Sequence, residues 1–277
     1  MPTDRYAVIG HPVDHSLSPT IHAAFASATG EDLVYDRIDA PPDGFAAAAE
    51  AFFADRGRGL NVTVPFKAEA FTWCTHASAR ALRAGVVNTL SAEAGGLVAG
   101  DNTDGIGLVR DLVDNVGLTL AGAHVLLVGA GGAARGVLGP LLGARPARVT
   151  IANRTATRAH ELAAAFADAG DVTGSSFEAL AGAGPFDLVI NASAASLGGS
   201  VPPLPAGILR PGATVYDMMY GDRARPFLEW GRAAGATSAL DGLGMLVEQA
   251  AESFLVWRRV RPETGPVLAR LRAAGGG

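Results

Sequence analysis

A glycine-rich segment near the middle of the chain constrains the fold more than any other feature. Gly129, Gly131 and Gly132 follow an apolar run at 124–128 and precede a run with helical periodicity at 133–142. A strand, a glycine-rich turn and a helix in this order are the fingerprint of dinucleotide-binding folds, in which the helix amino terminus faces a pyrophosphate. The alternative is an ordinary turn between a strand and a helix.

The small residues of this turn have distinct predicted tasks. Gly129 permits the tight turn, Gly131 lets the backbone approach a pyrophosphate, and Ala134 lets helix and strand pack closely. The predicted cofactor contacts of the turn are Gly129, Ala130, Gly131, Gly132 and Ala133.

The residues around the turn alternate between strand-like and helical patterns. Strands are expected at 124–128, 148–152, 186–191 and 214–217, and helices at 133–142 and 155–169. This alternation predicts a parallel, doubly wound sheet of the Rossmann type.

The first hundred residues predict a separate α/β domain, as the length of 277 residues also favours. Its expected strands lie at 6–10, 33–39, 60–64, 86–90 and 97–100, and its expected helices at 19–29 and 43–55. A helical run at 103–116 leads into the second domain, and a last strong helix is expected at 243–259.

Charge and hydropathy exclude two classes of partner. The formal net charge is −5, and the arginines are scattered rather than aligned on one face, so a nucleic acid partner is not expected. No apolar run approaches the roughly 18 residues of a membrane-spanning helix. The amino-terminal residues do not resemble a signal peptide, so we expect a cytoplasmic protein. A monomer and a homodimer are both compatible with the sequence.

Cysteine and histidine spacing predicts neither a disulfide nor a metal site. Cys74 is the only cysteine, which excludes an intrachain disulfide and a thiolate metal cluster. His11, His15 and His22 lack the spacing of known zinc sites, so no metal is expected.

The residues after the second strand of the glycine-turn unit distinguish between the two nicotinamide dinucleotides. NAD-binding folds usually place an acidic residue there, which binds the ribose 2′-hydroxyl. Here the positions are Asn153, Arg154 and Thr155, with Arg158 one turn later. Guanidinium groups pair well with a 2′-phosphate, so NADP is the predicted cofactor. The alternative is that both arginines are ordinary solvated residues at a helix start.

Lys67 is the single lysine among 22 basic residues. Arginine stays protonated at accessible pH, whereas a lysine amine can be tuned to exchange a proton during turnover. Lys67 follows a predicted strand that carries Asn61 and Thr63 on one face and ends at Pro65. Because open α/β sheets bind ligands at the carboxyl ends of strands, Lys67 is a candidate acid/base residue. The alternative is an ordinary surface lysine.

Other polar residues lie near predicted strand and helix ends. Asn88 lies in an apolar run, and Asp104 opens a helical run, where an aspartate can equally cap the helix. Ser18 as N-cap and Pro19 at the first helical position would explain their segment structurally. The hydroxyls of Ser16 and Ser18 beside a helix amino terminus would also form a small anion site suited to a carboxylate.

Ordered motifs along essentially the whole chain resemble the shikimate dehydrogenase family. They lie at 15–19 (HSLSP), 61–67 (NVTVPFK), 88–89 (NT), 100–105 (GDNTDG), 129–133 (GAGGA), 153–155 (NRT), 216–220 (YDMMY) and 241–249 (DGLGMLVEQ). The resemblance implies NADP-dependent, reversible reduction of 3-dehydroshikimate to shikimate in aromatic amino-acid biosynthesis. It also implies a substrate-binding catalytic domain at 1–104, an NADP-binding Rossmann domain at 105–242 and helices at 243–277 that pack back on the first domain.

The resemblance assigns roles residue by residue. Lys67 would transfer the proton, and Asp104 would bind the substrate hydroxyl and orient the lysine. The implied substrate contacts are Ser16, Ser18, Asn61, Thr63, Asn88, Tyr220 and Gln249. The implied cofactor contacts beyond the glycine turn are Asn153, Arg154, Thr155 and Arg158 at the 2′-phosphate, and Met218 and Gly242 near the nicotinamide. The loop from Ser193 to Ser196 departs from the family's usual serine-rich run ending in glycine, so it receives no assigned contact.

Two competing functions remain at this point. An NAD-dependent quinate/shikimate dehydrogenase is disfavoured by the lack of an acidic residue at Asn153 and Arg154. A non-catalytic sensor of NADP or shikimate is disfavoured because Lys67 and Asp104 are both present.

Overall fold

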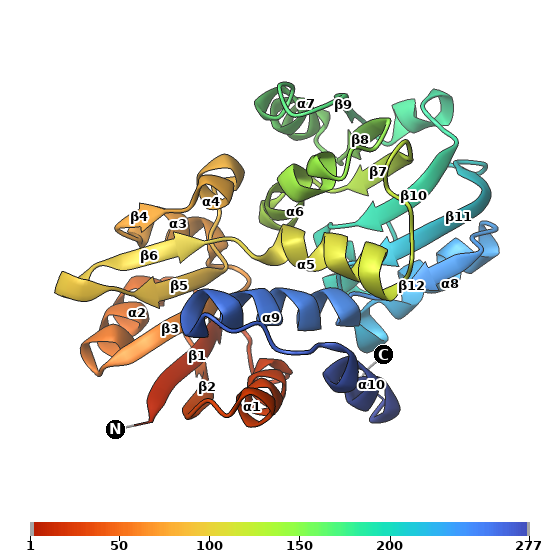
Figure 1. Cartoon of the computed structure of the whole chain (residues 1–277). Coiled ribbons are helices and arrows are strands. Elements are labelled where there is room, and N and C mark those ends of the chain that lie inside the picture. Colours follow the sequence, from red (N-terminus) through yellow and green to blue (C-terminus); the bar gives the residue numbers. More distant parts are fainter. Residues whose placement is uncertain (1–2, 276–277) are drawn as a thin grey trace. The chain divides into compact units, whose positions relative to one another are not determined.

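A computed structural model describes residues 3–275, which form two compact units (Figure 1). Within the described residues, unit 1 comprises 3–107 and 246–267, and unit 2 comprises 108–245 and 268–275. Residues 1–2 and 276–277 lie outside the described part. They belong to the predicted segments 1–104 and 243–277. The functional domains expected at 1–104, 105–242 and 243–277 stay a prediction.

Unit 1 contains a mixed six-stranded sheet in the order β2-β1-β3-β5-β6-β4. Its strands are β1 (Asp4–Gly10), β2 (Leu33–Asp39), β3 (Gly57–Val62), β4 (His76–Ala77), β5 (Thr89–Ala92) and β6 (Val98–Asp101). Only the pairings of β5 with β3 and β6 are antiparallel. Therefore β5 begins at the edge of the sheet where β1, β3 and β6 end.

Short helices and one long helix complete unit 1. They are α1 (Ser18–Thr29), α2 (Phe45–Ala54), α3 (Lys67–Trp73), α4 (Ala79–Ala84), the single turn η1 (Ala94–Gly96), the start of α5 (Asp104–Arg110) and α9 (Leu243–Arg258) from Leu246 onward. Helix α2 buries Phe45, Ala49 and Phe52, whose spacing places them on one helical face. This face packs against buried residues of β3, including Leu60, and forms the core of the unit.

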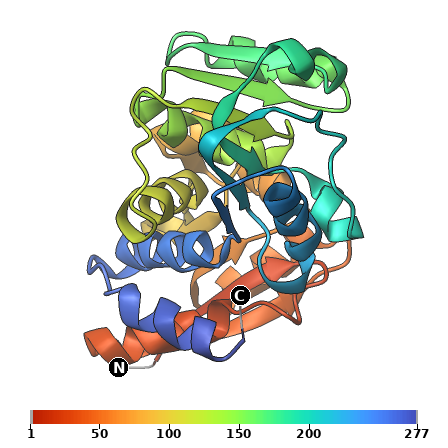
Figure 2. The ribbon, with the colours of Figure 1, turned by 90° about the vertical axis from the view of Figure 1, so that its right-hand side faces the viewer.

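Unit 2 contains a fully parallel sheet in the order β12-β11-β10-β7-β8-β9. Its strands are β7 (His124–Val128), β8 (Arg148–Ala152), β9 (Val172–Ser175), β10 (Phe186–Asn191), β11 (Leu209–Asp217) and β12 (Ser238–Leu240). Numbered within the unit, this order is 6-5-4-1-2-3, which is that of a Rossmann fold. The predicted fold class is confirmed, and Figure 2 shows the same ribbon turned by 90°.

The helical segments of unit 2 cover both faces of its sheet. They are the π-helical turn η2 (Asp111–Asn115), α6 (Gly132–Gly143), α7 (Ala156–Ala165), η3 (Glu178–Gly182), η4 (Ala194–Gly198), η5 (Gly221–Arg223) and α8 (Arg225–Ala233), and α10 (Gly265–Ala273) lies mostly in this unit. Strand β7 alternates between two separate cores: Val125 and Leu127 belong to one, and Leu126 and Val128 to the other. This alternation follows from the two-residue period of a strand. It explains why the strand is apolar throughout.

Several details of the predicted elements were wrong. The helix expected at 155–169 ends at Ala165, and the strand expected at 214–217 begins at Leu209. The strand expected at 60–64 ends at Val62, and the strand expected at 86–90 begins only at Thr89. Ser18 is not an N-cap: it is the first residue of α1, Leu17 is the cap position, and the side chain of Ser16 accepts the hydrogen bond from the Ser18 N–H at 3.3 Å. Pro19 is therefore the second helical residue rather than the first, and the cap position itself makes no side-chain hydrogen bond.

Candidate functional site

The chemically interesting residues of unit 1 converge on one edge of its sheet. Lys67 follows β3 and begins α3, and Asp104 follows β6 and begins α5. Asn88 immediately precedes β5, the strand that runs in the opposite direction. The carboxyl ends of β3 and β6 and the amino end of β5 therefore meet at the same place. This edge is where open α/β sheets bind ligands.

Lys67 and Asp104 form an ion pair at this edge. Lys67 Nζ donates to Asp104 Oδ2, and the two side chains are 19% and 6% exposed. Asp104 Oδ1 accepts from Asn88 Nδ2 at 2.8 Å. Both carboxylate oxygens are thus engaged by other elements, so helix capping does not account for Asp104. A partly exposed ammonium group held by a buried carboxylate is suited to proton exchange with a bound molecule.

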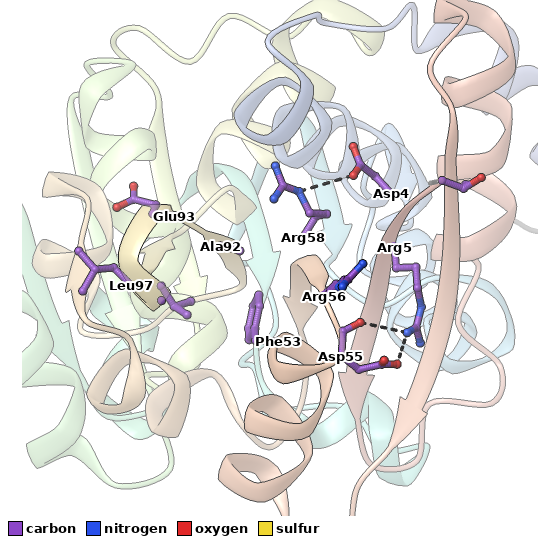
Figure 3. A pocket seen from close by; sticks show the side chains of 13 residues that line it. Asp4, Arg5, Phe53, Asp55, Arg56, Arg58, Ala92, Glu93 and Leu97 are labelled. Carbon is purple, nitrogen blue, oxygen red and sulfur yellow. Dashed lines mark hydrogen bonds and ion pairs between the residues drawn. The ribbon is translucent and has the colours of Figure 1, made fainter. Parts of the chain in front are cut away.

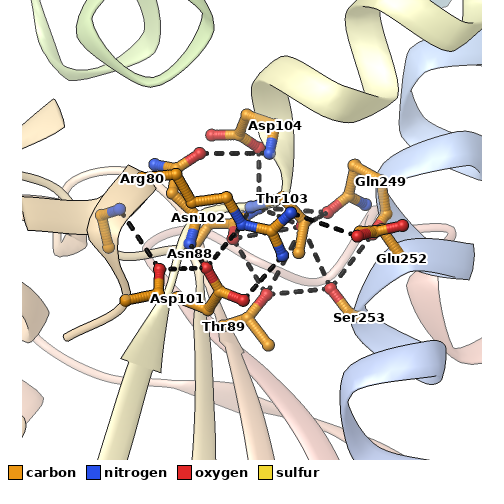
Figure 4. A network of polar contacts seen from close by, with 12 residues as sticks. Arg80, Asn88, Thr89, Asp101, Asn102, Thr103, Asp104, Gln249, Glu252 and Ser253 are labelled. Carbon is orange, nitrogen blue, oxygen red and sulfur yellow. Dashed lines mark hydrogen bonds and ion pairs between the residues drawn. The ribbon is translucent and has the colours of Figure 1, made fainter. Parts of the chain in front are cut away.

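Asn88 is the centre of a buried polar network (Figure 4). Its Oδ1 accepts from the backbone N–H of Thr103 at 2.8 Å and from the Thr89 hydroxyl at 2.9 Å. Its Nδ2 also faces Thr103 Oγ1 at 2.9 Å and Gln249 Oε1 at 3.3 Å. The Asn88 amide therefore fixes the position of Thr103, the residue before Asp104, and that of the Gln249 side chain. Buried networks of this kind are rigid when every member is satisfied.

Gln249 reaches the network because α9 approaches α5 closely. A Cβ atom at Gly107 would lie only 2.6 Å from the Cβ of Gln249, so only glycine allows this approach. Ser253, one turn further along α9, bonds to Thr89 Oγ1 at 2.9 Å and to Thr103 Oγ1 at 3.1 Å. Two turns of α9 thus face the polar network.

Asn61, in β3, adjoins the polar network and is 6% exposed. Its Nδ2 donates to Ser253 Oγ at 3.0 Å and to Asn88 O at 3.2 Å, and its Oδ1 accepts from the Tyr35 hydroxyl at 2.7 Å. The hydrogen-bonding capacity of Asn61 is therefore used within the unit. Thr63, two residues later, follows the end of β3 and is only half-buried.

His22, on α1, packs against Tyr35, the residue that donates to Asn61. Its ring stacks on Tyr35 with centroids 4.2 Å apart and an interplanar angle of 5°. His22 is fully buried, and neither ring nitrogen has a hydrogen-bond partner among the described residues. Burial lowers the pKa of His22 to about 3, with only a partial offset from the Asn61 side chain, so the ring is neutral.

Ser16 and Ser18 lie together at the start of α1, where their hydroxyl oxygens are 3.2 Å apart. Arg37 of β2 donates to the carbonyl oxygen of Ser16 from Nη2 at 2.6 Å and from Nε at 3.2 Å. This arginine had no predicted role. It positions the loop so that both hydroxyls remain beside the helix amino terminus, where an anion is favoured.

The glycine turn of unit 2 lies at the point where the strand order reverses, between β7 and β10. Gly129 has φ +112°, and a Cβ atom there would lie 3.0 Å from the carbonyl carbon of Ala192. The loops after β7 and β10 therefore touch through backbone alone. Gly131 is exposed, and nothing lies within 4 Å of the position its Cβ would occupy. This opening, directly before α6, fits a pyrophosphate at the helix amino terminus.

The end of β8 carries the predicted 2′-phosphate contacts. Arg154 and Arg158 are exposed, and neither forms an ion pair with a carboxylate of residues 3–275. Asn153 Nδ2 donates to the carbonyl oxygen of Thr155 at 3.0 Å, which closes the turn before α7. Two uncompensated guanidinium groups beside the dinucleotide turn fit the 2′-phosphate of NADP.

The remaining predicted cofactor residues also lie in unit 2. A Cβ atom at Gly242 would lie 2.3 Å from the carbonyl oxygen of Met218, so these two backbones are in close contact.

The loop from Ser193 to Ser196 and the residues after β11 also lie in this unit. Ser196 is buried and donates to Asp217 Oδ2 at 2.6 Å. Burial raises the pKa of Asp217 above its ordinary value. Tyr220 also belongs to unit 2, so the structure does not group it with the substrate contacts predicted in unit 1.

A cavity of about 550 Å³ lies at the opposite edge of the unit 1 sheet, where β1, β3 and β6 begin (Figure 3). Four of its charged lining residues pair with one another: Arg5 binds Asp55, and Arg58 lies 3.6 Å from Asp4. The lysine, aspartate and amide groups all lie at the other edge. We therefore place the candidate site at the carboxyl ends of the strands.

Residues 3–275 contain neither a cluster of metal-ligating side chains nor a helix that could cross a membrane. No three or more His, Cys, Asp or Glu side chains are placed to share a metal ion there. None of the helices in this part of the chain has both the length and the apolar character of a membrane crossing.

The structure adds residues that the sequence patterns did not single out, namely Tyr35, Arg37, Arg80, Thr89, Asn102, Thr103 and Ser253. Asn102 and Thr103 belong to the GDNTDG motif, so that motif could have indicated them. Thr89 belongs to the NT motif at 88–89, which could likewise have indicated it. Tyr35, Arg37, Arg80 and Ser253 lie outside these motifs and are brought to the site by tertiary contacts.

A paired lysine and aspartate at a ligand-binding strand edge, with a dinucleotide turn in a Rossmann unit, define a dinucleotide-dependent oxidoreductase. Family models match at residues 8–90, "Shikimate dehydrogenase substrate binding domain", and at residues 111–197, "Shikimate / quinate 5-dehydrogenase". The shikimate dehydrogenase (NADP(+)) of Alkalilimnicola ehrlichii is 58% identical over 98% of this chain and 99% of its own. The chain belongs to the shikimate dehydrogenase family.

Solved structures agree with this assignment. The Ael1 enzyme of Pseudomonas putida superposes with a TM-score of 0.90 and 45% identity, covering 97% of this chain and 98% of that one. Shikimate 5-dehydrogenase of Thermus thermophilus, solved with NADP(H) and shikimate, has a TM-score of 0.84 and 32% identity, covering 98% and 100%. The similarity therefore spans both units.

Proposed function

We propose that this protein catalyses the NADP-dependent, reversible reduction of 3-dehydroshikimate to shikimate, a step of aromatic amino-acid biosynthesis. The observation that carries the proposal is the Lys67–Asp104 pair, held by Asn88 at the ligand-binding edge of unit 1. Support comes from relatives named shikimate dehydrogenase (NADP(+)) that match over the whole chain. Cytoplasmic location, expected from the sequence, stays a prediction.

Unit 2 would hold the cofactor. The open turn at Gly131 and the amino terminus of α6 would bind the pyrophosphate, and Arg154 and Arg158 would bind the 2′-phosphate. When bound, the cofactor supplies a hydride from C4 of its nicotinamide. Catalysis requires that this nicotinamide and the substrate held by unit 1 come into contact during turnover.

Unit 1 would hold the substrate and move the proton. In the direction of reduction, hydride adds to the C3 carbonyl carbon while Lys67 Nζ donates a proton to the carbonyl oxygen, which becomes a hydroxyl. In the reverse direction the neutral amine accepts that proton. Asp104 orients the amine and accepts a hydrogen bond from a substrate hydroxyl. A proton held at the reacting oxygen lowers the barrier because charge develops on that oxygen in the transition state.

The other residues would orient the substrate ring. Ser16 and Ser18 would hold the carboxylate at the amino terminus of α1, where the free N–H groups favour an anion. Thr63, Asn88, Gln249 and Tyr220 would bind the hydroxyl groups. Asn61 is also a proposed substrate contact. Its amide is engaged by Tyr35 and Ser253, and that of Asn88 by Asp104 and Thr103, so each would exchange one of these bonds on binding substrate.

A substrate and cofactor comparison tests the proposal. Absorbance of the nicotinamide band is followed with shikimate or quinate, each in the presence of NADP or NAD. We expect the largest kcat/KM for shikimate with NADP. A larger value for quinate with NAD would assign a different activity, and no turnover with any pair would support a non-catalytic sensor.

A further inference from the structure

Arg80, on α4, joins two carboxylates beside the candidate site, of which Glu252 is buried and Asp101 is half-buried (Figure 4). Its Nε and Nη2 donate to the two oxygens of Asp101, each at 2.6 Å, and its Nη1 donates to Glu252 Oε1 at 3.1 Å. The Arg80 side chain is only 26% exposed, and those of Asp101 and Glu252 are 16% and 11% exposed. Such a two-pronged contact restrains both distance and orientation.

One of these carboxylates is connected to Asp104 through the backbone. Asp101 Oδ1 accepts from the N–H of Asn102 at 2.7 Å. Asn102 Oδ1 in turn accepts from the N–H of Asp104 at 3.1 Å, while its Nδ2 donates to the carbonyl of Val86 at 3.1 Å. The orientation of Asp101 therefore determines where the segment leading to Asp104 can lie.

Asp101 stays ionised in this environment. Burial alone would raise the pKa of its carboxyl group, but hydrogen bonds from Arg80 and Ser78 bring that pKa below its ordinary value. Removing Arg80 would leave the half-buried carboxylate of Asp101 without its main counter-charge. Such a group is driven to move toward water.

The second carboxylate connects Arg80 to the helix that carries Gln249. Glu252 lies three residues after Gln249 on α9. Arg261 donates to Glu252 Oε2 at 3.1 Å and to Glu248 Oε2 at 2.6 Å. An ionic chain thus runs from β6 through Arg80 to this face of α9.

We propose that Arg80 is a positioning residue for catalysis. It sets the location of Asp104 relative to Lys67, and of Gln249 relative to Asn88, without touching substrate or cofactor itself. This inference rests on the proposed function and deepens it. Arg80 joins segments far apart in the sequence: it is 21 residues from Asp101 and 172 residues from Glu252. Arg80 therefore fixes the positions of β6 and α9, the two elements that it joins beside the polar network, relative to each other.

Chemical rescue of Arg80→Ala tests the proposal. The substitution removes a planar cation from between Asp101 and Glu252 and leaves a space of the same shape. We expect kcat/KM for shikimate to fall about 10- to 100-fold, as for a small misplacement of reacting groups, while the KM for NADP is unchanged. Added guanidinium chloride, far below denaturing concentrations, should restore much of the loss, whereas urea, which has the same shape without the charge, should not.

Arg258→Ala is the matched control. Arg258 also joins two carboxylates, Asp4 and Glu31, and its side chain is 18% exposed, but it lies at the far end of α9. We expect it to lower the melting temperature as much as Arg80→Ala does, with kcat/KM changed less than twofold and no effect of guanidinium. An equal kinetic loss in both variants would show a merely structural role for Arg80 and overturn the proposal.

Arg80→Lys keeps the test decisive if the alanine variant does not fold. Lysine retains a charge between the two carboxylates but loses the two-pronged contact, so we expect an intermediate loss of kcat/KM. Full activity in Arg80→Lys, or a folded Arg80→Ala with unchanged kcat/KM, would overturn the proposal. An inactive wild-type protein would instead refute the proposed function, so the two failures are distinguishable.

Discussion

The candidate sites of the two units consist of different kinds of groups, namely buried side chains in unit 1 and a backbone turn with exposed side chains in unit 2. In unit 1, Asp104 and Asn88 are buried side chains that bond to each other and, through Asp104, to Lys67. In unit 2, the candidate cofactor site combines an open backbone turn with the exposed side chains of Arg154 and Arg158. Members of a shared network move together, whereas exposed arginines act separately.

The difference matches the two proposed tasks. Proton transfer depends on placing a donor within a few tenths of an ångström of the reacting atom, which a rigid network of buried side chains supplies. Binding a phosphate depends mainly on charge and on N–H groups that face it, which exposed arginines and a helix amino terminus supply. Substitutions should therefore reduce turnover in unit 1 and cofactor affinity in unit 2.

The largest effect is expected at Lys67. Lys67→Arg and Lys67→Met should keep the fold and NADP binding while turnover falls about 10²–10⁴-fold, the usual contribution of a positioned acid/base group. This loss corresponds to roughly 3–5 kcal/mol of barrier. Arginine should not substitute, because it stays protonated and its planar head is larger. Steady-state turnover across pH, with thermal melts and NADP titration as controls, provides the measurement. Near-full activity of Lys67→Arg with an unchanged pH profile would remove Lys67 from the proton-transfer role.

The corresponding test in unit 2 is Arg154→Ala. Loss of a charge-assisted contact costs about 1.5–3 kcal/mol, so the KM for NADP should rise about 10- to 100-fold while turnover with NAD changes little. Because Arg154 and Arg158 are exposed, their separate effects should add in the double variant to within about 0.5 kcal/mol. An equal loss with both cofactors would contradict the 2′-phosphate assignment. Strong coupling between the two arginines would contradict the contrast drawn between the units.

The pH dependence of the free energy of unfolding tests the buried histidine of unit 1. His22 stays neutral in the folded protein because its pKa is lowered to about 3, whereas in the unfolded chain it takes up a proton below its ordinary pKa of about 6.5. The free energy of unfolding should therefore fall as the pH drops from 7 toward 3, by about 2 kcal/mol at pH 5 from this group alone.

His22→Phe should remove this sensitivity, since both ring nitrogens lack partners among the described residues and a phenyl ring can stack on Tyr35. Chemical denaturation at pH 7 and pH 5 gives the comparison. The stability difference between the variant and the wild type should shift in favour of the variant at pH 5. A pH-independent difference would show that His22 titrates normally.

The smallest effect is expected for the serine pair. Ser16→Ala with Ser18→Ala should weaken shikimate binding about tenfold, the equivalent of about 1.4 kcal/mol, and leave NADP affinity unchanged. The fold should persist, because Arg37 still holds the Ser16 carbonyl oxygen. Calorimetric titration of shikimate measures the change. Unaltered shikimate affinity would reduce both hydroxyls to a role in the start of α1.

The sequence predicted the bounds of four strands correctly. The bounds expected for β2, β7, β8 and β10 are those observed, and the apolar residues of β7, β8 and β10 explain why these three were recognised. The longest strand, β11, was predicted only over its last four residues. The two-residue β4 and the three-residue β12 were not predicted, since such short segments contain too few residues to display a period. Helices α3 and α4 were missed for the same reason.

Of the candidate site, the sequence alone determined the residue types: a lone lysine, a glycine turn after an apolar strand, and arginines instead of an acid after the next strand. These are local features, and their chemistry does not depend on distant contacts. Only the tertiary structure decided which groups meet. Lys67 and Asp104 are 37 residues apart, and Asn88 and Gln249 are 161 apart. Their contacts exist because β5 runs antiparallel to its neighbours and α9 returns to unit 1, and strand pairing and helix packing of that kind depend on burial across the whole unit rather than on local sequence.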